Sequence, residues 1–111
     1  MQLAATLARE AHADRCLLVD CLTLWLSNLL CAENATLFAR ERDALLSLLP
    51  DLPGTLILVS NEVSLGLVPL GELSRRYVDE AGRLHQRLAA HCSRVVFCIA
   101  GLPQILKGTL P

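Results

Sequence analysis

The stretch RCLLVD at residues 15–20 decides the fold of this chain, together with two further stretches that share its pattern. The second is TLILVS at residues 55–60, and the third is RVVFCIA at residues 94–100. Short apolar runs bounded by charged or polar residues are typical of strands that are buried on both faces of a parallel sheet. We therefore expect three buried strands at these positions.

Helical patterns separate the three stretches. Residues 2–13 place apolar side chains at four-residue spacing, residues 22–31 are apolar on nearly every side, and residues 35–49 and 72–91 are amphipathic. Asn34 is expected to cap the helix at 35–49. Strands that alternate with helices are joined by right-handed crossovers, which predicts an α/β fold with a parallel sheet and helices on both faces. Three strands are few for such a sheet, so we expect that one or two are absent or come from a neighbouring chain.

Length and composition indicate a single domain over residues 1–111. The chain is 53% hydrophobic and has a net charge of −1 without a basic tract, which excludes a disordered chain and a typical nucleic-acid-binding protein. Leucine accounts for 26 of the 111 residues. A domain of this size leaves about a third of its unfolded-chain surface exposed, so some of this leucine should lie outside the core of a monomer. The excess predicts a partner surface or a missing piece of the same fold.

The cysteines and the apolar runs indicate the cellular compartment in which the protein is expected. Five cysteines occur without a CxxC pair, and an odd number without a signal peptide favours a reducing cytoplasm over a disulfide framework. The longest apolar run, residues 17–31, is too short to span a bilayer and contains Asp20. We expect a cytoplasmic protein with no membrane span.

Polar residues follow two of the predicted strands, where the functional groups of parallel α/β sheets collect. Asp20 could hold Mg²⁺ against nucleotide phosphates, or it could cap the following helix, and the pattern alone leaves both open. Ser60, Asn61 and Glu62 offer a hydroxyl, an amide and a carboxylate in succession. They could converge on a site or form a polar turn that leaves the sheet. The third strand end, Ala100–Gly101, offers no such group.

Other side chains have simpler explanations than catalysis. Cys21 is expected to be a packing residue, because the neighbouring Asp20 disfavours its thiolate. Trp25 is expected in the core or at a subunit contact, and Arg75 and Arg76 are expected to face solvent or a phosphate. A catalytic role is not expected for any of the three histidines, His12, His85 and His91. The chain also contains none of the motifs GxxxxGKS/T, GxGxxG and GxSxG.

Three segments in order carry a family resemblance: LVDCLTLWLSNLL at residues 18–30, LVSNEVSLGLVP at residues 58–69 and AGLPQILK at residues 100–107. With them the chain resembles the bifunctional adenosylcobinamide kinase / adenosylcobinamide-phosphate guanylyltransferase family of cobalamin biosynthesis. The resemblance implies a P-loop, RecA-like fold and assembly into homotrimers. It implies phosphorylation of adenosylcobinamide with ATP or GTP, then transfer of GMP from GTP to adenosylcobinamide phosphate through a guanylylated histidine, which gives adenosylcobinamide-GDP.

The resemblance also assigns candidate site residues. Asp20 matches the family's acidic residue that contacts the nucleotide or its Mg²⁺, and Asn61 and Glu62 match a turn near the site. Nucleotide-binding roles are therefore expected for Asp20, Asn61 and Glu62, with Mg²⁺ at Asp20 and ATP or GTP as the nucleotide. The chain departs from the family pattern at three positions: Ser64 could alter the backbone freedom of its loop, and Val78 and His85 put further polar contacts in doubt.

The family's glycine-rich phosphate loop and its nucleophilic histidine lie upstream of the region that Met1 begins. His12 is not at the position of that histidine, so the catalytic residues are unknown. The chain is expected to be the C-terminal portion of the fold, lacking the N-terminal strand, the phosphate loop and the histidine segment, and to be inactive alone. An alternative is a non-catalytic assembly or regulatory subunit that uses the helix at 22–31 as a contact with a full-length homologue. A small independent nucleotide-binding domain is a third hypothesis, which the absent phosphate loop disfavours.

Overall fold

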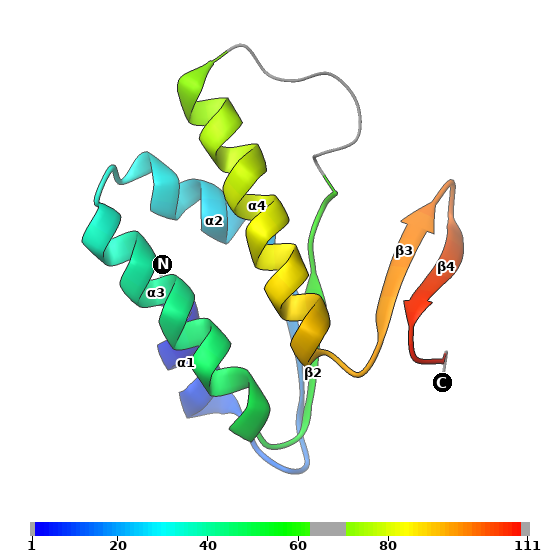
Figure 1. The fold of residues 1–111 in the computed structure, drawn as a ribbon. Coiled ribbons are helices and arrows are strands. Elements are labelled where there is room, and N and C mark those ends of the chain that lie inside the picture. The colour runs from blue at the N-terminus through cyan, green and yellow to red at the C-terminus, as the bar shows by residue number, and fades with distance from the viewer. Residues whose placement is uncertain (1, 63–70, 110–111) are drawn as a thin grey trace.

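The computed structural model describes residues 2–62 and 71–109, and within them helices and strands alternate along the chain (Figure 1). The helices are α1 (Leu3–Glu10), α2 (Leu22–Cys31), α3 (Ala35–Leu48) and α4 (Glu72–His91), with a short 3₁₀ helix, η1 (Leu49–Asp51), after α3. The strands are β1 (Cys16–Asp20), β2 (Thr55–Val59), β3 (Val95–Ile99) and β4 (Leu102–Lys107). The predicted helices and the first two strands are therefore present, although α1 is shorter than expected.

Strands β1 and β2 form a parallel pair, as predicted. Their register runs from Cys16 opposite Thr55 to Asp20 opposite Val59. The backbone N–H of Thr55 donates to the carbonyl oxygen of Arg15 at 3.0 Å, just before the pair begins. Gly54 makes this approach possible: its φ is +81°, and a Cβ there would run into the carbonyl oxygens of His12 and Arg15.

The core lies between the helices and one face of this sheet. The four largest fully buried side chains are leucines of α2 and α3: Leu22, Leu29, Leu30 and Leu45. Trp25 is also buried there, which confirms its expected place in the core. Six of the ten residues of α2 are buried inside this chain, so the helix at 22–31 has little surface left for the subunit contact of the alternative hypothesis.

Helices cover only one face of the β1–β2 pair, so the expectation of helices on both faces is wrong for the described part of the chain (Figure 1). Along β1 and β2 partly buried residues alternate with exposed ones. Leu18 and Ile57, which are register partners on the uncovered face, are 63% and 48% exposed. A parallel sheet is stable when both faces are covered, and an uncovered face leaves apolar side chains in water. Part of the leucine excess is accordingly found at the surface.

The third predicted strand has a different partner from the one expected. β3 pairs antiparallel with β4, and it does not join the β1–β2 pair as a buried parallel strand. Ala100 and Gly101 have φ angles of 53° and 76°, the positive values that a two-residue hairpin turn requires. Lys107 holds the hairpin against α4, because its Nζ donates to the carbonyl oxygens of Ala89 and Ala90 at 2.8 and 3.2 Å. The carboxyl end of β3 is therefore a tight turn.

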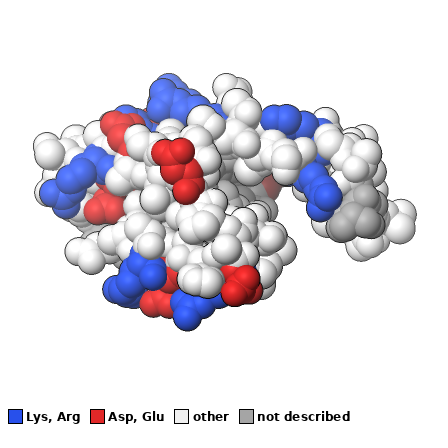
Figure 2. All heavy atoms as spheres, turned by 90° about the horizontal axis from the view of Figure 1, so that it is seen from below, with Lys and Arg blue, Asp and Glu red and all other residues white. Residues whose placement is uncertain are grey.

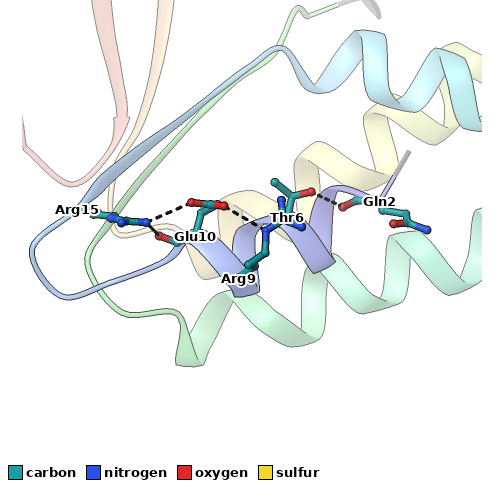
Figure 3. A network of polar contacts seen from close by, with 5 residues as sticks. All are labelled: Gln2, Thr6, Arg9, Glu10 and Arg15. Atoms are coloured by element: carbon teal, nitrogen blue, oxygen red, sulfur yellow. Dashed lines mark hydrogen bonds and ion pairs between the residues drawn. The ribbon is translucent and has the colours of Figure 1, made fainter.

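A polar network on the surface ties α1 to the loop before β1 (Figure 3). Arg15 Nη1 donates to the backbone oxygen of Glu10 at 3.0 Å and to its Oε2 at 3.2 Å, while Arg9 Nε lies 3.1 Å from Glu10 Oε1. Thr6 Oγ1 donates to the carbonyl oxygen of Gln2 within the first turn at 3.0 Å. All of these groups are exposed, so the network orients the loop and contributes little to stability.

The surface charges are mixed in sign. Figure 2 shows Lys and Arg interspersed with Asp and Glu, without a broad field of one sign on that face. This distribution agrees with the net charge of −1. Among the described helices, none combines the length and the apolar character needed to cross a membrane.

Candidate functional site at the carboxyl ends of β1 and β2

The parallel register brings the predicted site residues to one edge of the β1–β2 pair. Asp20 is the last residue of β1 and lies opposite Val59, the last residue of β2. Asn61 and Glu62 follow β2 after one intervening residue, Ser60, at the same edge, and both are exposed. Because parallel strands end on the same side, the three residues that sequence reasoning selected lie at the same edge of the pair.

Thr23 connects this edge to the helices. It is buried, with 8% of its surface exposed, in the first turn of α2. Its Oγ1 accepts a hydrogen bond from Asn61 Nδ2 at 3.3 Å and lies 2.9 Å from Cys21 Sγ. Its side chain also hydrogen-bonds Tyr77 of α4; burial raises the pKa of the Tyr77 phenol, and this bond opposes the rise. Thr23 thereby holds the turn after β2 against α2 and α4.

Cys21 differs from its expected behaviour. The hydrogen bond with Thr23, followed by the backbone N–H of Leu24, lowers the pKa of the Cys21 thiol, while burial and the charge of Asp20 oppose this shift to a smaller extent. The charge of Asp20 disfavours the thiolate, as expected, but the hydrogen bonds outweigh it. Short-range hydrogen bonds at the start of a helix stabilise the thiolate more than one exposed carboxylate destabilises it.

Asp20 does not cap the helix that follows it. The N-cap residue of α2 is Cys21, and the exposed Asp20 carboxylate makes no hydrogen bond or ion pair within residues 2–62 and 71–109. No group of three or more His, Cys, Asp or Glu side chains suited to a metal occurs in that part of the chain. One available carboxylate fits Mg²⁺ that arrives with nucleotide phosphates, since such ions use one or two carboxylates together with the phosphates.

A hydrogen bond between Ser60 and His85 borders the edge, and the sequence did not reveal it. Ser60 Oγ and His85 Nε2 lie 2.6 Å apart. Both line a cavity of about 440 Å³ that also contacts Glu62. The sequence feature that could have indicated this contact is the position of His85 on α4. It lies four residues after Ala81 and three before Leu88, which are both buried. That spacing places His85 on the inward face of the helix.

The remaining candidates lie away from this edge. His12 is exposed, and its Nδ1 accepts a hydrogen bond from the backbone N–H of Asp14 at 3.2 Å; His91 is the last residue of α4. The guanidinium of Arg76 lies 5.8 Å from the centre of the Phe38 ring, a cation–π contact. Ser64, one of the departures from the family pattern, lies outside the described residues.

Comparison with known proteins identifies the family. Residues 1–106 match the family described as cobinamide kinase / cobinamide phosphate guanyltransferase. The chain is 65% identical over 108 residues to the bifunctional adenosylcobalamin biosynthesis protein CobP of Pseudomonas aeruginosa, covering 97% of this chain and 62% of the relative. It is 34% identical over 107 residues to the bifunctional adenosylcobalamin biosynthesis protein CobU of Salmonella typhimurium, covering 85% of this chain and 59% of the relative.

The protein CobU of Escherichia coli, with the same description, is 31% identical over 113 residues, covering 86% of this chain and 62% of the relative. The chain thus spans about three-fifths of the length of these relatives, which are named as bifunctional proteins of adenosylcobalamin biosynthesis. The family match and these identities show that the chain belongs to the cobinamide kinase / cobinamide phosphate guanyltransferase family of cobalamin biosynthesis.

Proposed function

We propose that this chain forms the nucleotide-facing edge of an enzyme that phosphorylates adenosylcobinamide with ATP or GTP and then transfers GMP from GTP to adenosylcobinamide phosphate. The observation that carries the proposal is the position of Asp20, Asn61 and Glu62 at the carboxyl ends of two parallel strands. In open α/β sheets, ligands bind outside these strand ends. The family match supplies the class of reaction, and the names of the relatives agree with it.

In this proposal each residue has a separate task. Asp20 would hold Mg²⁺, which when bound neutralises charge on the nucleotide phosphates. Asn61 would orient a polar group of the nucleotide, with its own amide fixed by the bond to Thr23. Glu62 would act as an acceptor for a donor group of the nucleotide at the same edge. The residues would position the nucleotide and neutralise the charge of its phosphates. These two tasks are most of what phosphoryl transfer requires from a protein.

The residues that hold the phosphates and the histidine that carries GMP are proposed to come from the part of the relatives that this chain does not match. No GxxxxGKS/T motif occurs in the chain, and its catalytic residues remain unassigned. Because positioned electrostatic groups supply most of the catalysis, the chain alone should have no activity. Incubated with labelled GTP, it should acquire no stable histidine-linked label. The homotrimer is likewise a proposal for the complete protein.

A chimera tests the proposal. In the Pseudomonas aeruginosa relative, the matched segment is replaced by the corresponding 108 residues of this chain, and the kinase and guanylyltransferase steps are measured. Both activities should be retained. Asp20→Asn in the chimera should lower both by about a hundredfold or more, the order of magnitude for loss of one pre-organised electrostatic group.

Asp14→Asn is the matched control, because Asp14 lies in the exposed loop before β1 and should leave both activities unchanged. A folded chimera without either activity would contradict the proposal. Full activity of the Asp20→Asn chimera at limiting Mg²⁺ would show that Asp20 is not part of the site.

A further inference from the structure

The turn that follows β2 is held by side chains of two different helices. Residues 60–62 come directly after β2 and belong to no strand or helix, so the register of the β1–β2 pair does not fix them. Ser60 Oγ lies 2.6 Å from His85 Nε2 of α4. Asn61 Nδ2 donates to Thr23 Oγ1 of α2 at 3.3 Å. Two successive residues of the turn are therefore attached to the helical layer on separate helices.

His85 provides a rigid attachment point for this turn. Its neighbours on the inward face of α4, Ala81, Leu84 and Leu88, are all buried, so packing fixes the part of the helix from which the imidazole projects. Ser60 and His85 are partly buried, and a hydrogen bond in such surroundings is stronger than one in open water. A serine hydroxyl can donate as well as accept, so the bond forms whichever ring nitrogen of His85 carries the proton.

We propose that His85 is a positioning residue of the nucleotide site, which acts through Ser60 to fix the turn that carries Asn61 and Glu62. The inference rests on the proposed function, because it takes Asn61 and Glu62 to bind the nucleotide. His85 itself needs no contact with the nucleotide, since Ser60 precedes these two residues directly in the chain. A turn that is already ordered before the nucleotide arrives loses less conformational entropy on binding, so a ligand binds it more tightly.

A histidine at this place could also serve only to fill the core beside α4. The two roles predict different results when the imidazole is removed. A core-filling residue stabilises the whole fold, so its loss lowers the free energy of unfolding and the amount of folded enzyme. A positioning residue affects the turn, so its loss weakens nucleotide binding while the rate of the bound enzyme changes little. Two experiments separate the roles.

The first experiment measures amide hydrogen exchange by mass spectrometry on the 111-residue chain without nucleotide, so it does not depend on the proposed activity. In His85→Ala, exchange in peptides that cover residues 56–62 should be about fivefold faster, the factor that corresponds to loss of one hydrogen bond. Exchange in α3 should not change. His85→Gln should restore the wild-type rate, because its amide can place a hydrogen-bonding group near the position of Nε2. Arg87→Ala, at an exposed position two residues further along α4, is the control and should exchange like the wild type.

The second experiment uses the chimera with the Pseudomonas aeruginosa relative and measures the KM for GTP and kcat separately. His85→Ala should raise this KM by about tenfold, because the nucleotide must then order about one residue of the turn that was ordered before, and kcat should stay within about twofold. His85→Gln should keep the KM near the wild-type value. Ser60→Ala should raise the KM as His85→Ala does, and the double variant should raise it no further, since both residues belong to one contact.

Faster exchange throughout the chain in His85→Ala, or a lower kcat with an unchanged KM, would assign His85 a core-filling role and overturn the inference. Effects of His85→Ala and Ser60→Ala that add in the double variant would show that His85 does not act through Ser60. A His85→Gln variant that behaves like His85→Ala would exclude the hydrogen bond as the cause. A folded but inactive chimera would contradict the proposed function, whereas unchanged exchange at residues 56–62 in His85→Ala would contradict this inference alone.

Discussion

Thr23 has the largest structural role of any single polar residue at the site. It lies in the first turn of α2, yet its hydroxyl connects Asn61 after β2, Cys21 before α2 and Tyr77 in α4. A buried hydroxyl must be hydrogen-bonded to be tolerated, and here the partners come from three elements. Thr23 thereby sets where Asn61 can present its amide, although Thr23 itself is too buried to be a principal ligand contact.

Replacing Thr23 by valine should slow alkylation of Cys21 by iodoacetamide near neutral pH. The thiolate is the reactive form, and the bond with Thr23 is the main reason that the pKa of Cys21 lies below its ordinary value. Without the hydroxyl, this pKa rises, a smaller fraction of the thiol is ionised at a given pH, and the rate profile moves to higher pH. Peptide mapping by mass spectrometry measures the rate, with exposed Cys98 as the internal reference.

Thr6→Val is the matched control, since the Thr6 hydroxyl bonds the exposed carbonyl of Gln2, the N-cap residue of α1. It should leave the Cys21 rate unchanged. An unchanged Cys21 profile in Thr23→Val would show that the hydroxyl does not govern the thiol.

At the scale of elements, close backbone approaches and local caps place the strands and helices. Asn34 Oδ1 accepts the N–H of Leu37 at 3.0 Å, which begins α3 as its capping position predicts. Gly54 lets the chain enter β2 beside the residues that precede β1, where no side chain fits. The start of the β1–β2 register therefore depends on one residue without a Cβ.

Gly54→Ala should lower the free energy of unfolding by more than about 1 kcal/mol, because alanine is strained at positive φ and its Cβ meets two carbonyl oxygens. Gly82→Ala is the control in the middle of α4, where a Cβ meets no atom within 4 Å. It should raise the free energy of unfolding by about 0.5–1 kcal/mol through helix propensity. Urea denaturation measures both, and a destabilisation of equal size at the two positions would contradict this account.

At the scale of the whole molecule, the described residues form a layer of helices on one face of a parallel pair and a hairpin that stands apart (Figure 1). The opposite face of the pair carries apolar side chains in water, including the register partners Leu18 and Ile57. Exposed apolar surface of this kind favours association. The chain should therefore self-associate at high concentration.

Leu18→Thr combined with Ile57→Thr should shift the chain toward monomer in sedimentation velocity experiments, because threonine is β-branched, which suits a strand, and the two changes remove apolar surface. Leu24→Thr is the control: Leu24 is also 62% exposed but lies on α2, away from the sheet. The control should associate like the wild type. Wild-type chain that stays monomeric at high concentration would contradict the prediction.

The local sequence pattern was sufficient to predict most of the helices and strands of this protein. Helical periodicity located α3 and α4, a longer apolar stretch located α2, the capping position of Asn34 marked the start of α3, and short apolar runs located β1, β2 and β3. Asp20, Asn61 and Glu62 follow from the rule that parallel strands end at one edge, which places all three at the same end of the β1–β2 pair. Each of these inferences rests on residues close in sequence or on a general rule of topology.

Only the tertiary structure decided which strands pair and which distant side chains form hydrogen bonds. An apolar run of five residues is the same whether it joins a parallel sheet or a hairpin, and β3 pairs with β4. The bond between Ser60 and His85 joins residues 25 apart, and that between Thr23 and Asn61 joins residues 38 apart. Such contacts depend on which edges and faces are available once the helices have packed. That availability is a property of the assembled molecule, so no short stretch of sequence contains it.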